Sequence, residues 1–318
     1  PVGFLVAGNT PLHPDGSALP IFSGNRNLEA LIKEHHISIV AVANHVDRTR
    51  ELVQSFFAAI PLGATIVDFP RFYEAVEGKV PVSLISETWF LENLINARRP
   101  KYDLAKRLID LTLTLLLGAL ALILLPFIAA AIVLSTPRDI LAYRTRRARR
   151  GDGMVFFRQE RIGKNGRPFE FLKFRSQVLG AERYGSEKGT GPTGASPSGF
   201  SPDPRAYPVG TLLRKTYLDE LPQLWNIIKG DMSFVGPRPE RPEFVAELEG
   251  EIPFYRTREL VLPGITGWAQ INMQNDASVS DAPEKIQYDL YYIKHRSIAL
   301  DLTVLLKTAL KLLQRSGR

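Results

Sequence analysis

The chain has 318 residues, 45% of them hydrophobic and 23% charged, so it can build an ordinary core and is neither disordered nor collagen-like. It has no cysteine, which excludes disulfides, thiolate metal sites and a cysteine nucleophile. Residues 1–100 carry 8 basic and 10 acidic side chains, whereas residues 101–318 carry 32 basic and 23 acidic ones, so the net charge of +7 comes from the second part. This excess suits an anionic partner such as nucleic acid, a phosphorylated small molecule or a membrane surface.

Residues 1–95 have the pattern of a small α/β domain. Val2–Ala7, Ile37–Ala43 and Ala64–Phe69 are short apolar runs typical of strands, and Asp47–Ile60 has apolar residues at helical spacing. Alternating strands and helices predict a parallel α/β unit. No glycine-rich dinucleotide fingerprint follows these strands, so we expect a structural or regulatory role. We also expect this domain to begin before Pro1.

The segment Leu111–Pro137 is expected to enter a membrane. Its 27 residues carry no formal charge, and a bilayer core needs about 20 apolar residues of helix; a buried core helix is the alternative. Pro126 lacks a backbone N–H and predicts a kink or break inside the segment. Basic residues flank both ends, and positive charge marks the cytoplasmic side. We therefore favour a re-entrant helix broken at Pro126 over a helix that crosses the bilayer once.

Residues 151–318 form a third region of mixed character. Ser176–Ala206 is rich in Gly, Ser and Pro and predicts a long, mobile loop. From Pro283 onward the pattern is that of an amphipathic helix, with an apolar stripe that includes Leu302, Leu306 and Leu310. Such a stripe fits a membrane surface or the domain itself equally well.

The chemistry of this region is expected at charged residues beside turns. The signatures of zincins, α/β-hydrolases and P-loop NTPases do not occur. Arg and Lys side chains near Gly and Pro suit phosphate binding, and an Asp–Glu pair before a helix is expected to stay ionised, ready to bind magnesium or to attack phosphorus. The simpler alternatives are that Asp219 is a helix cap and that Arg238 is a surface ion-pair partner. The residues concerned are Lys173, Arg175, Arg205, Arg214, Asp219, Glu220 and Arg238.

Six stretches in order carry a resemblance to a known family. They are Lys106–Asp110, "QERIGKNGRPF" at Gln159–Phe169, "KFRS" at Lys173–Ser176, "LRKTYLDELPQLWNIIKGDMSFVGPRPE" at Leu213–Glu240, "PGITGWAQIN" at Pro263–Asn272 and "YDLYYI" at Tyr288–Ile293. Through them, residues 101–318 resemble the bacterial sugar transferase family of monotopic phosphoglycosyl transferases. Residues 1–95 resemble the Rossmann-like α/β domain, here incomplete, that precedes the catalytic part in large members.

The resemblance implies a mainly α, membrane-embedded monotopic catalytic domain at residues 151–318, with the re-entrant helix and its basic flanks at residues 96–150. It implies that Asp219 and Glu220 are the catalytic pair and bind Mg²⁺. It also implies that five basic residues handle the phosphates and nucleotide: Lys173, Arg175, Arg205, Arg214 and Arg238. One departure is Leu125 before Pro126, where the family usually has serine.

The implied reaction transfers a sugar-1-phosphate from a UDP-sugar to undecaprenyl phosphate through a covalent phosphosugar on Asp219. It would be the first membrane step of exopolysaccharide, capsule or O-antigen synthesis, on the cytoplasmic face of the bacterial inner membrane among its lipids. The resemblance leaves a homodimer open, and no sequence feature identifies the sugar. The alternative is a non-catalytic membrane scaffold or regulator with the same fold. Nucleic acid is not an expected partner, since aromatic residues do not alternate with the basic ones.

Overall fold

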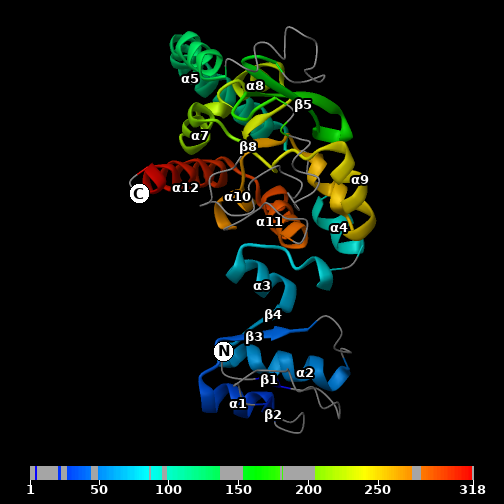
Figure 1. The fold of residues 1–318 in the computed structure, drawn as a ribbon. Coiled ribbons are helices and arrows are strands. Elements are labelled where there is room, and N and C mark those ends of the chain that lie inside the picture. The colour runs from blue at the N-terminus through cyan, green and yellow to red at the C-terminus, as the bar shows by residue number, and fades with distance from the viewer. Residues whose placement is uncertain are drawn as a thin grey trace. The chain divides into compact units, whose positions relative to one another are not determined.

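The chain forms two compact units, Pro1–Ile85 and Ser86–Arg318 (Figure 1). The structure is a computed structural model that describes residues 4–5, 21–22, 27–43, 49–85, 87–94, 99–136, 153–179, 181, 205–273 and 281–316. The first unit ends before the expected boundary at residue 95 because helix α4, Glu87–Leu94, packs on the second unit. There the ring of Phe90 stacks on that of Phe254, with centroids 3.7 Å apart.

The first unit has the expected parallel α/β arrangement. Its elements are β1 (Phe4–Leu5), β2 (Ile21–Phe22), α1 (Leu28–His35), β3 (Ile39–Val42), α2 (Arg50–Ala59), β4 (Thr65–Asp68) and α3 (Phe69–Glu77). β1 pairs with β2 and β3 with β4, both in parallel, and α2 connects β3 to β4. Three strands and α2 were predicted, whereas α1, β2 and α3 were not. The described strands form two separate two-stranded sheets and not the single continuous parallel sheet of a Rossmann-like domain.

The second unit is mainly helical. Its helices are α4, α5 (Pro100–Ser135), α7 (Pro208–Lys215), α8 (Gln223–Lys229), α9 (Pro242–Glu251), α10 (Trp268–Asn272), α11 (Ala282–His295) and α12 (Ile298–Ser316). Two small sheets complete it: the antiparallel hairpin of β5 (Phe156–Ile162) and β6 (Pro168–Phe174), and the parallel pair of β7 (Ser233–Val235) and β8 (Gly264–Thr266). The mainly α character expected for this part of the chain is confirmed.

Helix α5 has 36 residues and contains the predicted apolar segment. It is the one helix in the described part of the chain that is long and apolar enough to cross a membrane. Its middle is exposed, with Leu115 at 76%, Leu122 at 72% and Phe127 at 70% of their full accessibility, which argues against a buried core helix. A kink or break was expected at Pro126; the helix continues through this residue, so it is not broken there, and a proline removes a single helix hydrogen bond.

Both ends of the apolar segment contact other elements of the second unit. Near its start, Asp110 is buried and accepts a hydrogen bond from the backbone N–H of Phe234 in β7 at 3.2 Å. Near its end, Ile128 and Ile132 belong to a buried cluster of side chains from α5, β6 and α7. The members of this cluster are Ile128, Ile132, Phe174, Tyr207 and Leu213.

The C-terminal part of the chain forms two helices, α11 and α12, rather than one. In α12 the predicted apolar stripe faces solvent: Leu306 is 66%, Leu310 56% and Leu313 71% exposed. The domain therefore does not cover this stripe. The basic residues after Pro137 and most of the predicted loop Ser176–Ala206 lie outside the described residues.

Candidate functional site

The site forms where three segments meet. Lys173 is on β6, Asp219 and Glu220 are in a 3₁₀ turn at Leu218–Glu220, and Arg238 follows β7. The Lys173 ammonium lies 2.8 Å from Glu220 Oε1 and 3.9 Å from Asp219 Oδ2. The Arg238 guanidinium lies 3.6 Å from Glu220 Oε1. Glu220 is thus held between two cations, which leaves Asp219 the less tightly paired carboxylate.

The backbone before the carboxylate pair turns sharply. α7 ends at Lys215, and Tyr217 adopts a left-handed conformation with φ of 56°, which is unfavourable for a residue with a side chain. Leu218 and Leu221 pack against the buried cluster of α5, β6 and α7 and so hold the turn in place. Pro222 then precedes α8, as its fixed φ allows. This local sequence presents Asp219 and Glu220 just ahead of a short helix.

The loop that carries Arg238 is fixed by close backbone contacts. A Cβ atom at Gly236 would lie 2.3 Å from the Leu262 carbonyl oxygen, so no other residue fits there without a shift. The Gly236 N–H donates to the Thr266 carbonyl at 2.9 Å, and the Gly264 N–H donates to the Pro237 carbonyl at 2.9 Å. The loop therefore continues the β7–β8 pairing and holds the Arg238 side chain on a rigid turn.

Burial and ion pairs act in opposite directions on the two carboxyl groups. Burial raises the pKa of Asp219, the cations Lys173, Arg214 and Arg238 lower it and the charge of Glu220 raises it, and the net pKa is about 6. Burial also opposes the ionisation of Glu220, but Lys173 and Arg238 outweigh it and lower the pKa of that carboxyl. Desolvation therefore works against the ionisation expected for Asp219 before a helix, but at pH 7 the carboxylate form still prevails.

The predicted basic residues have different positions. Lys173, Arg214 and Arg238 surround the carboxylate pair, since all three charges act on Asp219. Arg175 is buried and donates to the Met154 carbonyl at 3.0 Å and to Thr136 Oγ1 at 2.8 Å, so it ties the end of α5 to the hairpin. The Arg205 carbonyl accepts a hydrogen bond from the Val178 N–H at 2.9 Å.

A buried ionic network beneath the Arg238 loop was not predicted. Glu240 lies 2.8 Å from the Lys285 ammonium, 3.5 Å from Arg258 and 3.8 Å from Arg161, and these cations lower the pKa of Glu240 to about 2 although burial opposes it. Arg258 also pairs with Asp289 at 2.9 Å. The sequence does contain a signal, because Lys285 and Asp289 share the helix face of α11 that is otherwise buried and apolar.

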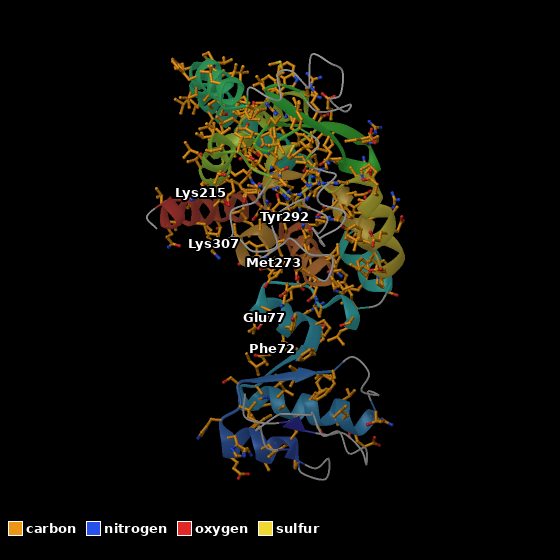
Figure 2. The ribbon with its side chains drawn as sticks, viewed as in Figure 1. Phe72, Glu77, Lys215, Met273, Tyr292 and Lys307 are labelled. Atoms are coloured by element: carbon orange, nitrogen blue, oxygen red, sulfur yellow. The ribbon has the colours of Figure 1, made fainter. Side chains whose placement is uncertain are left out.

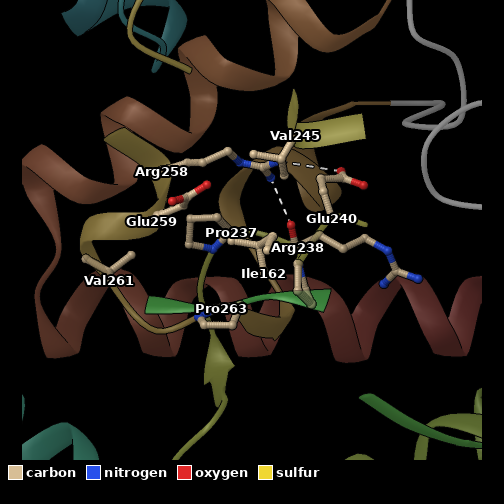
Figure 3. A pocket seen from close by; sticks show the side chains of 11 residues that line it. Ile162, Pro237, Arg238, Glu240, Val245, Arg258, Glu259, Val261 and Pro263 are labelled. Carbon is tan, nitrogen blue, oxygen red and sulfur yellow. Dashed lines mark hydrogen bonds and ion pairs between the residues drawn. The ribbon is translucent and has the colours of Figure 1, made fainter. Parts of the chain in front are cut away.

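The network holds the backbone from which the Arg238 side chain projects. Arg258 donates to the Arg238 carbonyl at 2.9 Å, and Arg161 donates to the Pro239 carbonyl at 3.1 Å. Figure 3 shows Arg258 between Glu240 and this carbonyl, while the Arg238 side chain extends away from it. The adjacent cavity measures about 20 Å³, room for one water molecule rather than a substrate.

The carboxylate pair fits one mode of magnesium binding. Within the described residues no group of three or more His, Asp or Glu side chains is arranged to hold a metal ion, so a cage made of protein ligands is not present there. Mg²⁺ is often bound through one or two carboxylates together with substrate phosphates. Asp219 and Glu220 supply the protein part of such a donor set.

Comparison with known proteins identifies relatives of the chain. The chain is 42% identical over 165 residues to the UDP-N-acetylgalactosamine-undecaprenyl-phosphate N-acetylgalactosaminephosphotransferase of Aeromonas hydrophila, covering 52% of this chain and 37% of the relative. It is 37% identical over 211 residues to the UDP-glucose:undecaprenyl-phosphate glucose-1-phosphate transferase of Escherichia coli, covering 65% and 40%. A putative undecaprenyl-phosphate N-acetylgalactosaminyl 1-phosphate transferase of Bacillus subtilis is 35% identical over 164 residues, covering 52% and 78%.

The chain thus spans well under half the length of the Aeromonas and Escherichia proteins. The profile of the family described as "Bacterial sugar transferase" matches residues 148–315, more than half of the chain. That stretch contains the carboxylate pair and the three cations around it. The resemblance carried by the six sequence stretches is confirmed, and the chain belongs to the bacterial sugar transferase family.

Proposed function

We propose that the chain transfers a sugar-1-phosphate from a UDP-sugar to undecaprenyl phosphate, releasing UMP. The observation that carries the proposal is the buried Asp219 beside Glu220, with Lys173, Arg214 and Arg238 around them. A carboxylate surrounded by cations can approach a phosphate diester despite the negative charge of both groups. The names of the relatives support the two substrates.

The transfer proceeds in two displacements at one carboxylate. In the first, an Asp219 oxygen attacks the phosphorus that bears the sugar, an Asp–O–P bond forms, and the P–O bond to UMP breaks with its electron pair leaving on UMP. In the second, a phosphate oxygen of undecaprenyl phosphate attacks the same phosphorus, and the Asp219 carboxylate leaves. The pKa of about 6 suits both steps, because the group is ionised at neutral pH yet is a competent leaving group.

The other residues bind and orient. Arg238 and Arg214 hold phosphate oxygens, since guanidinium forks match them in a bidentate manner. Lys173 neutralises Glu220, which keeps that carboxylate in place beside the nucleophile. Mg²⁺ held by Asp219 and Glu220 would neutralise charge on the diphosphate when bound.

We further propose that α5 enters the membrane from the cytoplasmic face, bends at Pro126 while it stays helical, and returns to the same face. Side chains near both ends of the apolar segment, Asp110 and Ile132, are buried against the same unit, as a re-entrant helix requires. The exposed leucine stripe of α12 supports a unit that rests on the bilayer surface. This position would bring the site to the level of the lipid phosphate.

Release of UMP tests the reaction. Full-length protein in liposomes with undecaprenyl phosphate and Mg²⁺ is given a panel of UDP-sugars, and we expect UMP with one or a few of them. Asp219→Asn should release none. Glu249→Gln is the control, because Glu249 is an exposed carboxylate on α9 that pairs with Arg256 at 2.6 Å and its loss should leave the rate near wild type. Folded wild-type protein that releases no UMP with any UDP-sugar would favour the scaffold alternative.

A further inference from the structure

The base of the membrane helix α5 contacts both halves of the site. The Arg107 guanidinium donates to the carbonyls of Ile227 at 2.6 Å and Ile228 at 2.9 Å, which lie in the last turn of α8. One helical turn further on, Asp110 accepts the backbone N–H of Phe234 in the middle of β7. Residues three apart on a helix share a face, so a single patch of α5 bonds two different elements.

These two elements are the neighbours in sequence of the segments that hold the site residues. α8 directly follows the turn with Asp219 and Glu220, and β7 directly precedes the loop with Arg238. The Arg107 fork bonds two carbonyls in the last turn of α8, where the Ile227 carbonyl also accepts the Gly230 N–H at 3.0 Å, and so fixes the position of this helix end. Asp110 is 3% exposed and fixes the position of β7 by accepting the Phe234 N–H. The spacing between the carboxylate pair and Arg238 therefore depends on α5.

A second set of contacts keeps this patch of α5 from sliding. The Asp301 carboxylate of α12 accepts hydrogen bonds from Tyr102 at 2.8 Å and Lys106 at 2.9 Å. The Tyr292 hydroxyl, which lies in the interior of the second unit (Figure 2), is 2.8 Å from Asp301 Oδ1 and 3.2 Å from the Val235 carbonyl oxygen. The base of α5 is thus anchored to β7 by way of α11 and α12 as well.

We propose that Arg107 and Asp110 are positioning residues of the transfer reaction: they brace the Asp219–Glu220 turn and the Arg238 loop against the base of the membrane helix and so set the distance between nucleophile and phosphate-binding arginine. The inference rests on the proposed function of the site. Its physical basis is the steep loss of rate when reacting groups move by about 1 Å, which can reach about a hundredfold.

The test compares two pairs of variants with one control in the same liposomes. Arg107→Met removes the fork but keeps much of the side-chain length, and Arg107→Lys restores a cation with a donor. Asp110→Ala removes the acceptor, and Asp110→Asn restores an oxygen that can accept the Phe234 N–H. Lys101→Gln is the matched control, since Lys101 is exposed in the first turn of α5. Its loss changes the charge of the helix base by the same amount as the loss of Arg107.

We expect kcat for UMP release to fall about tenfold or more in Arg107→Met, with KM for the UDP-sugar little changed, because α8 positions the nucleophile. In Asp110→Ala we expect a several-fold rise in KM, because β7 positions Arg238. Arg107→Lys and Asp110→Asn should recover part of each loss, and Lys101→Gln should match wild type. Unchanged kinetics in Arg107→Met and Asp110→Ala, or equal losses in Lys101→Gln, would overturn the proposal.

Hydrogen–deuterium exchange on the same samples gives a readout that does not need activity. The peptide spanning Asn226–Arg238 should exchange faster in Arg107→Met and Asp110→Ala than in wild type or Lys101→Gln, because the bonds at the end of α8 and in β7 are lost. Unchanged exchange there would overturn the brace whatever the rates. Should wild type release no UMP while exchange responds as expected, the proposed reaction is wrong and the brace between α5, α8 and β7 stands.

Discussion

At Asp219 the fold holds a carboxylate where its charge is unfavourable. Burial raises the pKa of this group to about 6, against an ordinary value of 3.8, and only the surrounding cations keep it from rising further. The folded state thus binds this proton more tightly than the unfolded chain does. The free energy of unfolding therefore decreases as the pH rises from about 4 to about 6. Active sites often hold a charged group at the expense of stability, as the role proposed for Asp219 would require.

The first prediction follows from this sign. The side chain in Asp219→Asn is neutral at every pH, so at pH 7.5 this variant should unfold at a higher temperature than wild type. We expect a gain of about 1–2 kcal/mol in the free energy of unfolding; the difference between the ordinary pKa of 3.8 and the value of about 6 in the fold sets an upper bound of about 3 kcal/mol. Near pH 4, where the folded wild type is itself protonated, the gain should shrink. Thermal unfolding in detergent at both pH values measures it, and a variant less stable than wild type at pH 7.5 would contradict the account.

Glu240 represents the opposite case, a buried carboxylate whose charge is stabilising. Three cations, Arg161, Arg258 and Lys285, converge on it and lower its pKa to about 2. Glu240→Gln leaves these cations without their shared partner and should destabilise the fold by about 3 kcal/mol. The control Glu249→Gln removes an exposed carboxylate 2.6 Å from Arg256 and should leave the unfolding temperature unchanged. Equal effects of the two substitutions would show that the network is not a stabilising core.

At the scale of elements, α5 carries the membrane prediction. If it re-enters, positions before and after the apolar segment lie on the same side of the bilayer. Single cysteines at Lys101 and Thr145 in this cysteine-free chain should both resist an impermeant thiol reagent added from the periplasmic side and react after lysis. Labelling of one position alone in intact cells would establish a full span. Pro126→Leu should increase labelling of one of the two, because it restores the helix hydrogen bond that proline lacks and so favours a straight helix that crosses.

Elements with strong periodicity were predictable, and those defined by tertiary contacts were not. The apolar run predicted α5 and the strand and helix patterns predicted β3, β4 and α2, because each pattern is a local consequence of burial. Helix α1 and the break between α11 and α12 were missed. At Pro126 the local rule predicted a break, but the helix continues, since the neighbouring turns keep their own hydrogen bonds.

The site shows the same division. Asp219, Glu220, Lys173 and Arg238 were found from charged residues beside turns and from the family resemblance, and the structure brings them together. Arg175 looked equivalent in sequence but is buried against Thr136, a difference that only the fold decides. The raised pKa of Asp219 could not be read from sequence, because it depends on how far the group is removed from water. For the Glu240 network the sequence offered one unused signal, the charged Lys285 and Asp289 on the apolar face of α11.

At the scale of the whole molecule, the two units predict where the activity resides. Every described residue of the site belongs to Ser86–Arg318, so protein starting at Ser86 should keep a rate of UMP release within a few-fold of that of the longer chain. Protein starting at Arg99 loses α4 and the stacking of Phe90 on Phe254, and should unfold at a lower temperature. Loss of all transfer in the Ser86 protein, despite normal folding, would assign the first unit a direct part in catalysis.

The most direct test of the account is the mass of the protein after incubation with the UDP-sugar and Mg²⁺ in the absence of lipid acceptor. The account predicts that wild type releases UMP in an amount equal to the enzyme and gains one sugar-phosphate, located on the peptide that contains Asp219. Asp219→Asn should gain nothing, and Glu220→Gln should gain the same mass slowly. Addition of undecaprenyl phosphate should return the protein to its original mass. If wild type releases UMP only when the lipid is present and no adduct is found after rapid quenching, the transfer is direct and Asp219 is not the nucleophile.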